Sequence, residues 1–149
     1  MNRRGFTFVE MLIVMIVIGI LATMAILKYI DLRNHAVAAG IARDVDVIRL
    51  GAYNHWADYD TFPSEASAGL VPATLTNYLP RNFSFTRPQY AYDWDNFGNG
   101  DGGYQVGLTV TMSDSRLQLL VMRSFEGRFP FFRHGDAITY VIVGPDGKM

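Results

Sequence analysis

The sequence contains no cysteine. No disulfide bond can therefore stabilise the chain, and a cysteine nucleophile is excluded. The stability of any folded domain must come from side-chain packing or from a bound ion. With 149 residues, of which 50% are hydrophobic, the chain has room for one small domain and an additional apolar segment.

The sequence also has little net charge and none of the common catalytic motifs. Its formal net charge of −1 at pH 7 provides no overall field that would attract nucleic acid or membrane phosphates. His35, His55 and His134 are scattered, and neither His-Glu-x-x-His nor Gly-x-Ser-x-Gly occurs. We therefore do not expect an enzyme. His35 and His55 lie on a predicted helix and are expected to face solvent or neighbouring chains.

A long apolar run near the amino terminus is the most informative feature of the sequence. It extends from Phe6 to Leu27 and contains one ionisable side chain, Glu10. At about 1.5 Å per residue, a helix of this length crosses a hydrocarbon layer of about 30 Å. A carboxylate in such a helix costs about 2.5 to 3.5 kcal/mol near its centre and tends to mark a functional site. The run therefore predicts a membrane anchor in which Glu10 has a partner.

Two other kinds of targeting segment explain this apolar run less well. A secretory signal peptide has about 7 to 15 apolar residues followed by an Ala-x-Ala-like site. The nearest candidate for that site, Thr23-Met24-Ala25, lies inside an apolar run that continues beyond it. A plain signal anchor explains the length of the run but explains neither the Gly5-Phe6 boundary nor Glu10.

The start of the chain resembles the type IV pilin and type II secretion pseudopilin superfamily. The resemblance rests on Arg4-Gly5-Phe6-Thr7, on Glu10 as the fifth residue after Gly5, and on an apolar run that contains Gly19. It implies that a prepilin peptidase removes residues 1–5 by cutting between Gly5 and Phe6. It also implies that the enzyme methylates the new amino group of Phe6.

The resemblance further implies assembly into a filament through the helix that begins at Phe6. A free α-amine has a pKa of roughly 7.7 to 8.0 and is largely cationic near neutral pH. The Glu10 carboxylate of one subunit could therefore pair with the Phe6 amine of its neighbour. The implied partners are prepilin peptidase, other pilin or pseudopilin subunits and an inner-membrane assembly platform.

The resemblance also sets the expected location and reveals one departure. Arg3 and Arg4 precede the run, but basic residues follow it as well, so charge alone does not decide the orientation. The resemblance implies a single-pass protein of the bacterial inner membrane, with its carboxy-terminal domain on the periplasmic or extracytoplasmic side before assembly. Many relatives have proline where this chain has Leu27, and without it the segment can remain helical.

The predicted fold is α+β and pilin-like, with a long amino-terminal helix packed on a small antiparallel sheet. Its transmembrane half covers residues 6–27, and its amphipathic half covers residues 28–60. An apolar stripe about 100° wide follows the second half. On the opposite face Val47 and Leu50 are apolar, which favours contact with other subunits. The stripe consists of Val37, Ile41, Val45, Ile48, Ala52, Trp56 and Tyr59.

The remaining residues, 61–149, are predicted to form a connecting αβ-loop and the sheet. The connector contains a short helix that begins at Pro72 and stops before Pro80. A helix capped by Ser113 or Asp114 and ending at Gly127 is expected, although a strand is the alternative there. Strands are predicted over residues 89–94, 104–112 and 138–143.

Two clusters in this domain are candidate binding sites. Asp93, Asp95, Asn99 and Asp101 place oxygen atoms close together in a glycine-rich loop, as a calcium site requires. The pattern lacks the full EF-hand spacing, and a solvated hairpin loop explains it better than a calcium site does.

The second cluster interleaves cations and aromatic rings near the carboxy terminus. Arg128 and Arg133 are its candidate ligand-binding residues, because such a pattern suits single-stranded nucleic acid. The near-zero net charge makes nucleic acid an unlikely partner. The resemblance leads us to expect a structural subunit of a pseudopilus or type IV pilus, which serves protein secretion or pilus function. The alternative is a minor subunit at the filament tip that binds DNA, a secretion substrate or a surface.

Overall fold

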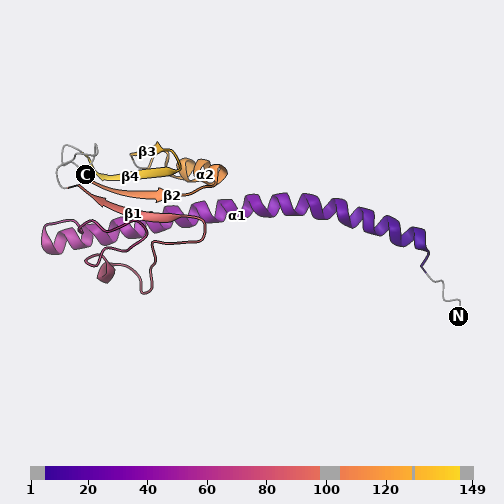
Figure 1. Cartoon of the computed structure of the whole chain (residues 1–149), viewed down its shortest axis with the longest axis horizontal. Helices are drawn as coiled ribbons and strands as arrows, with labels where there is room; N and C mark the ends of the chain where they lie inside the picture. The colour runs from indigo at the N-terminus through magenta and orange to yellow at the C-terminus, as the bar shows by residue number, and fades with distance from the viewer. Residues whose placement is uncertain (1–5, 98–104, 129, 145–149) are drawn as a thin grey trace.

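The computed structural model describes residues 6–97, 105–128 and 130–144. Its spine is helix α1, Phe8–Tyr59, which runs without interruption through Gly19 and Leu27. The prediction that this segment stays helical without proline is confirmed. Figure 1 shows α1 as a gently curved rod, with the rest of the chain gathered around its carboxy-terminal half. The helix ends at Asp60, whose left-handed φ of 55° turns the chain back.

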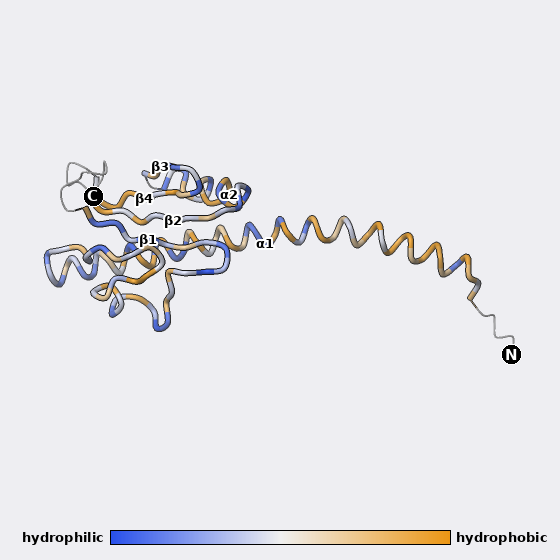
Figure 2. The backbone as a smooth tube through the Cα atoms, in the orientation of Figure 1, coloured by the Kyte–Doolittle hydropathy of each residue, from blue (hydrophilic) through white to orange (hydrophobic). Residues whose placement is uncertain are grey.

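The two halves of α1 have different surroundings. The amino-terminal half projects alone, and its side chains are exposed from Phe8 through Arg33. Figure 2 shows mainly apolar colouring along this projecting half. Asn34 is the first buried residue of α1, and from there the inner face is covered by the domain. The domain therefore covers α1 from Asn34 onward and leaves the preceding residues of the helix uncovered.

A four-stranded antiparallel sheet packs on the amphipathic half of α1, which confirms the predicted α+β, pilin-like fold. The strands follow the spatial order β1-β2-β4-β3, so β1 and β3 form the two edges. Helix α2 packs against α1 at the end of the domain nearest the projecting half. The elements after α1 are η1 (Thr76–Tyr78), β1 (Ala91–Asn96), β2 (Val106–Thr111), α2 (Ser115–Phe125), β3 (Phe131–His134) and β4 (Ala137–Val143).

The hydrophobic core lies between the inner face of α1, the sheet and α2. Ile41, Val45 and Ile48 of α1 are fully buried there. Trp94 of β1 and Leu108 of β2 are paired across the two strands and are also fully buried. The chain has no disulfide bond, so this apolar contact provides most of the stability of the domain.

The structure corrects several details of the predicted elements. The helix expected from Pro72 is only the short 3₁₀ turn η1, and β1 lies two residues later than predicted. The short edge strand β3 was not predicted. Between Asp114 and Gly127 the structure has a helix rather than a strand, as the cap at Asp114 indicated.

The predicted apolar stripe of α1 is correct in its middle and wrong at its end. The stripe residues Ile41, Val45, Ile48 and Ala52 are fully buried, but Trp56 and Tyr59 are 37% and 66% exposed. His55 occupies the inward position in their place, with 5% of its surface exposed. The expectation that His55 faces solvent or a neighbouring chain is therefore wrong, whereas His35 is exposed as expected.

Candidate functional site

The amino-terminal end of α1 is closed by a reciprocal set of hydrogen bonds between Thr7 and Glu10. The Glu10 amide donates to the Thr7 hydroxyl at 3.3 Å. In return, the Thr7 amide and hydroxyl both donate to Oε2 of Glu10, each at 2.8 Å. This arrangement is a capping box, in which the first turn of the helix satisfies its own amides. The Glu10 carboxylate is thus held at the helix start within a single chain.

The sequence analysis identified Glu10 but missed Thr7. The signal was present, because a threonine followed three residues later by a glutamate before an apolar run is the pattern of a capping box. In the structure, Thr7 supplies the intramolecular partner that compensates Glu10. Phe6 immediately precedes this cap and is 71% exposed. Gly5 lies outside the described residues.

The segment that follows is suited to a lipid environment. Within the described residues, α1 is a helix long and apolar enough to cross a membrane, and its most apolar window has a mean hydropathy of 2.6. Thr23 donates its hydroxyl hydrogen to the backbone carbonyl of Gly19, at 2.7 Å. This polar side chain is therefore satisfied inside the helix, as a lipid-exposed hydroxyl must be. The geometry is that of a membrane anchor carrying an extramembrane domain.

An exposed apolar helix joined to an antiparallel sheet domain is an α+β architecture consistent with a membrane-anchored protein. Residues 1–26 match the prokaryotic N-terminal methylation motif. This motif indicates the type IV pilin and pseudopilin superfamily, and hence a structural protein rather than an enzyme. The superfamily implies processing by prepilin peptidase and polymerisation with other pilins. The apolar helix and the motif are together consistent with inner-membrane anchoring before assembly. Neither a curated protein nor a solved structure matches the chain.

The structure places two members of the predicted calcium site on a strand. Asp93 and Asp95 belong to β1, which continues to Asn96, so they are not loop residues as the sequence analysis expected. Oδ2 of Asp95 accepts a hydrogen bond from the Thr109 hydroxyl at 2.7 Å. Asn99 and Asp101 lie outside the described residues. Among the described residues, no group of three or more acidic, histidine or cysteine side chains could hold a metal ion. Calcium binding stays a prediction.

Asp93 experiences an unfavourable environment for a negative charge. Partial burial raises its pKa above the usual value, and the nearby charges of Asp95 and Glu65 raise the pKa further. A carboxyl group with a higher pKa in the folded chain than in the unfolded chain binds protons preferentially when folded. The contribution of Asp93 to stability therefore falls as the pH rises through its folded-state pKa.

Replacement of this carboxylate is expected to stabilise the domain at neutral pH. An Asp93→Asn variant should raise the thermal midpoint by a few degrees in EDTA, which corresponds to at most about 1 kcal/mol. The gain should disappear below the usual aspartate pKa of 3.8, where the group is protonated in both states. Circular dichroism melts from pH 7 to pH 3 measure this difference.

Asp136→Asn is the matched control, because Asp136 is exposed in the turn between β3 and β4. That variant should melt like the parent chain at every pH. A lower midpoint for Asp93→Asn in EDTA would contradict the expectation. Repeating the melts in calcium chloride tests the metal prediction separately, since a calcium ligand at Asp93 would let calcium stabilise the parent chain but not the variant.

The two candidate ligand-binding arginines lie apart in different contacts. Nη2 of Arg128, just after α2, is 3.1 Å from Oδ2 of Asp46 on α1. Nε of Arg133, on the edge strand β3, donates to the Gly135 carbonyl at 3.0 Å. Arg128 thus ties the end of α2 to the long helix. The prediction that these arginines bind a ligand remains untested.

Proposed function

We propose that this chain is a structural subunit of a pseudopilus or type IV pilus. In this proposal, prepilin peptidase cuts between Gly5 and Phe6 and methylates Phe6. The mature chain then enters the filament through residues 6–27. The observation that carries the proposal is the amino-terminal methylation motif at the start of a helix whose apolar first half projects from the domain with its side chains exposed.

The capping box suggests how the subunit enters the filament. Removal of residues 1–5 would leave the new α-amine of Phe6 next to the Thr7 cap. In the membrane, Glu10 can keep its Thr7 partners, so anchoring does not require an unpaired carboxylate. On assembly, the same carboxylate can also accept the amine of a neighbouring Phe6. Such a charge-assisted contact would favour one register between adjacent helices.

Val47 and Leu50 were expected to contact other subunits, and the exposure of α1 supports this expectation for Leu50 alone. Leu50 is 62% exposed on the helix surface. Val47 instead packs partly against the hydrophobic core of its own domain. Leu50, together with the projecting half, therefore offers apolar surface that a filament would cover. The alternative is a minor subunit at the filament tip. Sheared filaments should contain large amounts of a main structural subunit but only small amounts of a tip subunit.

Intact mass and amino-terminal sequencing test the processing step. Chain purified from cells with a prepilin peptidase should begin at N-methyl-Phe6, whereas chain from a peptidase-null strain should retain Met1. A product that begins at Met1 in both strains, or that is cut near Ala25, would refute the proposal. Such a result would leave a plain membrane-anchored or secreted domain.

A further inference from the structure

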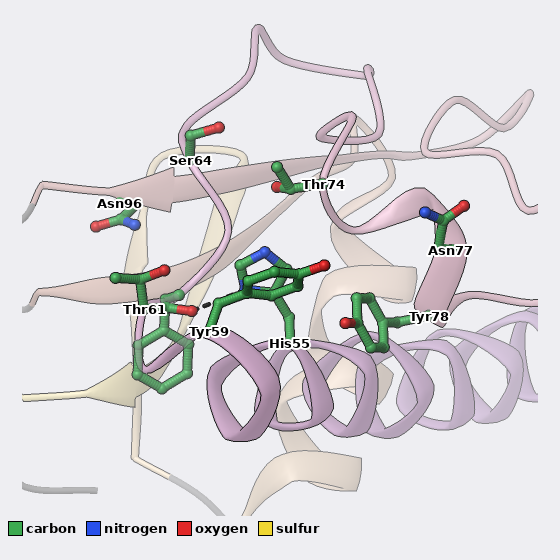
Figure 3. A pocket seen from close by; sticks show the side chains of 9 residues that line it. His55, Tyr59, Thr61, Ser64, Thr74, Asn77, Tyr78 and Asn96 are labelled. Carbon is green, nitrogen blue, oxygen red and sulfur yellow. Dashed lines mark hydrogen bonds between the residues drawn. The ribbon is translucent and has the colours of Figure 1, made fainter.

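A surface pocket lies at the carboxy-terminal end of α1, far from the membrane anchor. Its volume is about 750 Å³. Figure 3 shows side chains from the end of α1, from the segment after it and from η1 surrounding one open space. We call this space the His55 pocket. It is lined by His55, Tyr59, Thr61, Phe62, Ser64, Thr74, Asn77, Tyr78 and Asn96.

The walls of the His55 pocket are held by hydrogen bonds and close packing. The Pro63 carbonyl accepts hydrogen bonds from Nε1 of Trp94 at 3.0 Å and from Nδ2 of Asn96 at 2.8 Å. These two bonds fix the segment after α1 to strand β1. On the other side, a side chain at Gly51 would lie 3.2 Å from the Tyr78 carbonyl. Glycine at this position therefore allows η1 to pack directly on α1, and the pocket is preformed.

His55 forms the floor of the pocket and presents one nitrogen to it. Its Nδ1 lies 2.7 Å from the Thr61 carbonyl oxygen. A carbonyl can only accept, so Nδ1 carries the hydrogen, and in this tautomer of the imidazole Nε2 is left as the acceptor. Figure 3 shows the second ring nitrogen directed away from α1, toward the space beneath Ser64 and Thr74. A ligand in the pocket must therefore supply a hydrogen-bond donor to Nε2.

Two tyrosine rings flank the imidazole of His55. Their ring centroids lie 5.0 Å (Tyr59) and 5.6 Å (Tyr78) from the centroid of the imidazole. The Tyr78 hydroxyl donates to Oδ2 of Asp58 at 2.6 Å, and this bond raises the Tyr78 pKa to about 12. Its ring is thus fixed in place and uncharged. Tyr59 is 66% exposed and offers a free ring face at the pocket mouth.

The rim adds neutral polar groups and no fixed charge. Ser64, Thr74 and Asn77 are exposed and carry hydroxyl and amide groups that both donate and accept hydrogen bonds. Among the described residues that line the pocket there is no carboxylate, lysine or arginine. An anionic ligand would find no counter-charge in this lining, and the nearby Asp58 carboxylate is paired with the Tyr78 hydroxyl. A neutral ligand rich in hydroxyl groups would find hydrogen-bonding partners on Ser64, Thr74 and Asn77.

We propose that the His55 pocket binds a neutral carbohydrate. A sugar hydroxyl donates to Nε2 of His55, further hydroxyls bond to Asn77 and Thr74, and the apolar face of a sugar ring packs on Tyr59. Mixed aromatic and hydrogen-bonding walls around a preformed concavity are typical of small-ligand sites. This site does not depend on cleavage, methylation or assembly, so it can be tested on the isolated subunit.

The test uses the full chain in micelles of an amine-oxide detergent, which has no sugar headgroup. Neutral trisaccharides of glucose, mannose and N-acetylglucosamine are titrated by calorimetry, with trigalacturonate as the charged comparison. At least one neutral trisaccharide should bind in the millimolar range or tighter. Tyr59→Ala should weaken that binding about tenfold, the size of effect that an aromatic ring contact supplies. Asn77→Ala should also weaken it.

Tyr29→Ala is the matched control, because Tyr29 lies on the same helix and is 68% exposed. This variant should bind the sugar as tightly as the parent chain. Absence of binding for every neutral trisaccharide would overturn the proposal. Equal binding by the Tyr59→Ala and Tyr29→Ala variants would also overturn it, as would tighter binding of trigalacturonate.

Discussion

A Glu10→Ala chain should be cleaved and methylated normally but be absent from filaments. Cleavage at the Gly5-Phe6 bond precedes assembly and does not need the carboxylate in our proposal. Assembly does need it, because alanine removes both the capping partner of Thr7 and the acceptor for the neighbouring amine. We expect at least a tenfold fall in the variant's content of sheared filaments, equivalent to about 1.4 kcal/mol per subunit added. Immunoblots of membrane and sheared fractions measure this content.

Glu10→Gln separates the two roles of the side chain. Glutamine at the third helical position can still complete a capping box, because its amide oxygen accepts from the Thr7 amide. It cannot offer a negative charge to the Phe6 amine of a neighbour. If the intersubunit charge pair drives assembly, Glu10→Gln should fail as Glu10→Ala does. Normal filaments from the glutamine variant would instead assign the effect to helix capping alone.

Truncation of Trp94 should cause the largest loss of domain stability. The Trp94 side chain is fully buried, and its indole nitrogen donates to the Pro63 carbonyl. Removal of a buried tryptophan side chain typically costs about 3 to 5 kcal/mol. The stability of a domain is only about 5 to 15 kcal/mol, so Trp94→Ala should melt far below the parent chain or fail to fold. Circular dichroism melts of the full chain in detergent give the midpoint.

The other tryptophan provides an internal comparison. Trp56 is 37% exposed and stacks on Phe62, so Trp56→Ala should cost less than Trp94→Ala. A Trp94→Phe variant retains most of the apolar area but loses the bond to Pro63, and its midpoint should lie between those two. Similar midpoints for Trp94→Ala and Trp56→Ala would show that the β1 contact contributes little.

The sequence was most informative where one physical pattern continued over many residues. The apolar run and the stripe from Ile41 to Ala52 predicted α1, because helical periodicity and burial agree along this segment. The alternation through Leu108 and Val110 predicted β2 for the same reason. Strand β3 could not be found this way, since three of its four residues are exposed at a sheet edge and show no alternation.

The His55 pocket was hidden from sequence reasoning for a different reason. The three- and four-residue spacing of the buried positions on α1 reaches His55 after Ala52. Trp56 and Tyr59 fit the same spacing and are aromatic, so the sequence favours them as the buried residues. Burial of His55 depends on the Thr61 carbonyl, which returns to the helix only because Asp60 adopts a left-handed conformation. A turn of this kind, at a residue other than glycine, has no clear signature in a single sequence.

The continuity of α1 also fixes how high each part of the domain stands above a bilayer. If the hydrocarbon boundary lies near Leu27, only about 10 Å of helix separates it from Asn34, where the domain begins. Asn34 donates to the Asp114 carboxylate that caps α2, so the amino-terminal end of α2 is the part of the domain nearest the lipid surface. Tyr59 stands about 48 Å beyond the boundary along the helix axis. The unassembled subunit thus holds the His55 pocket well clear of the lipid surface, where soluble molecules can enter it.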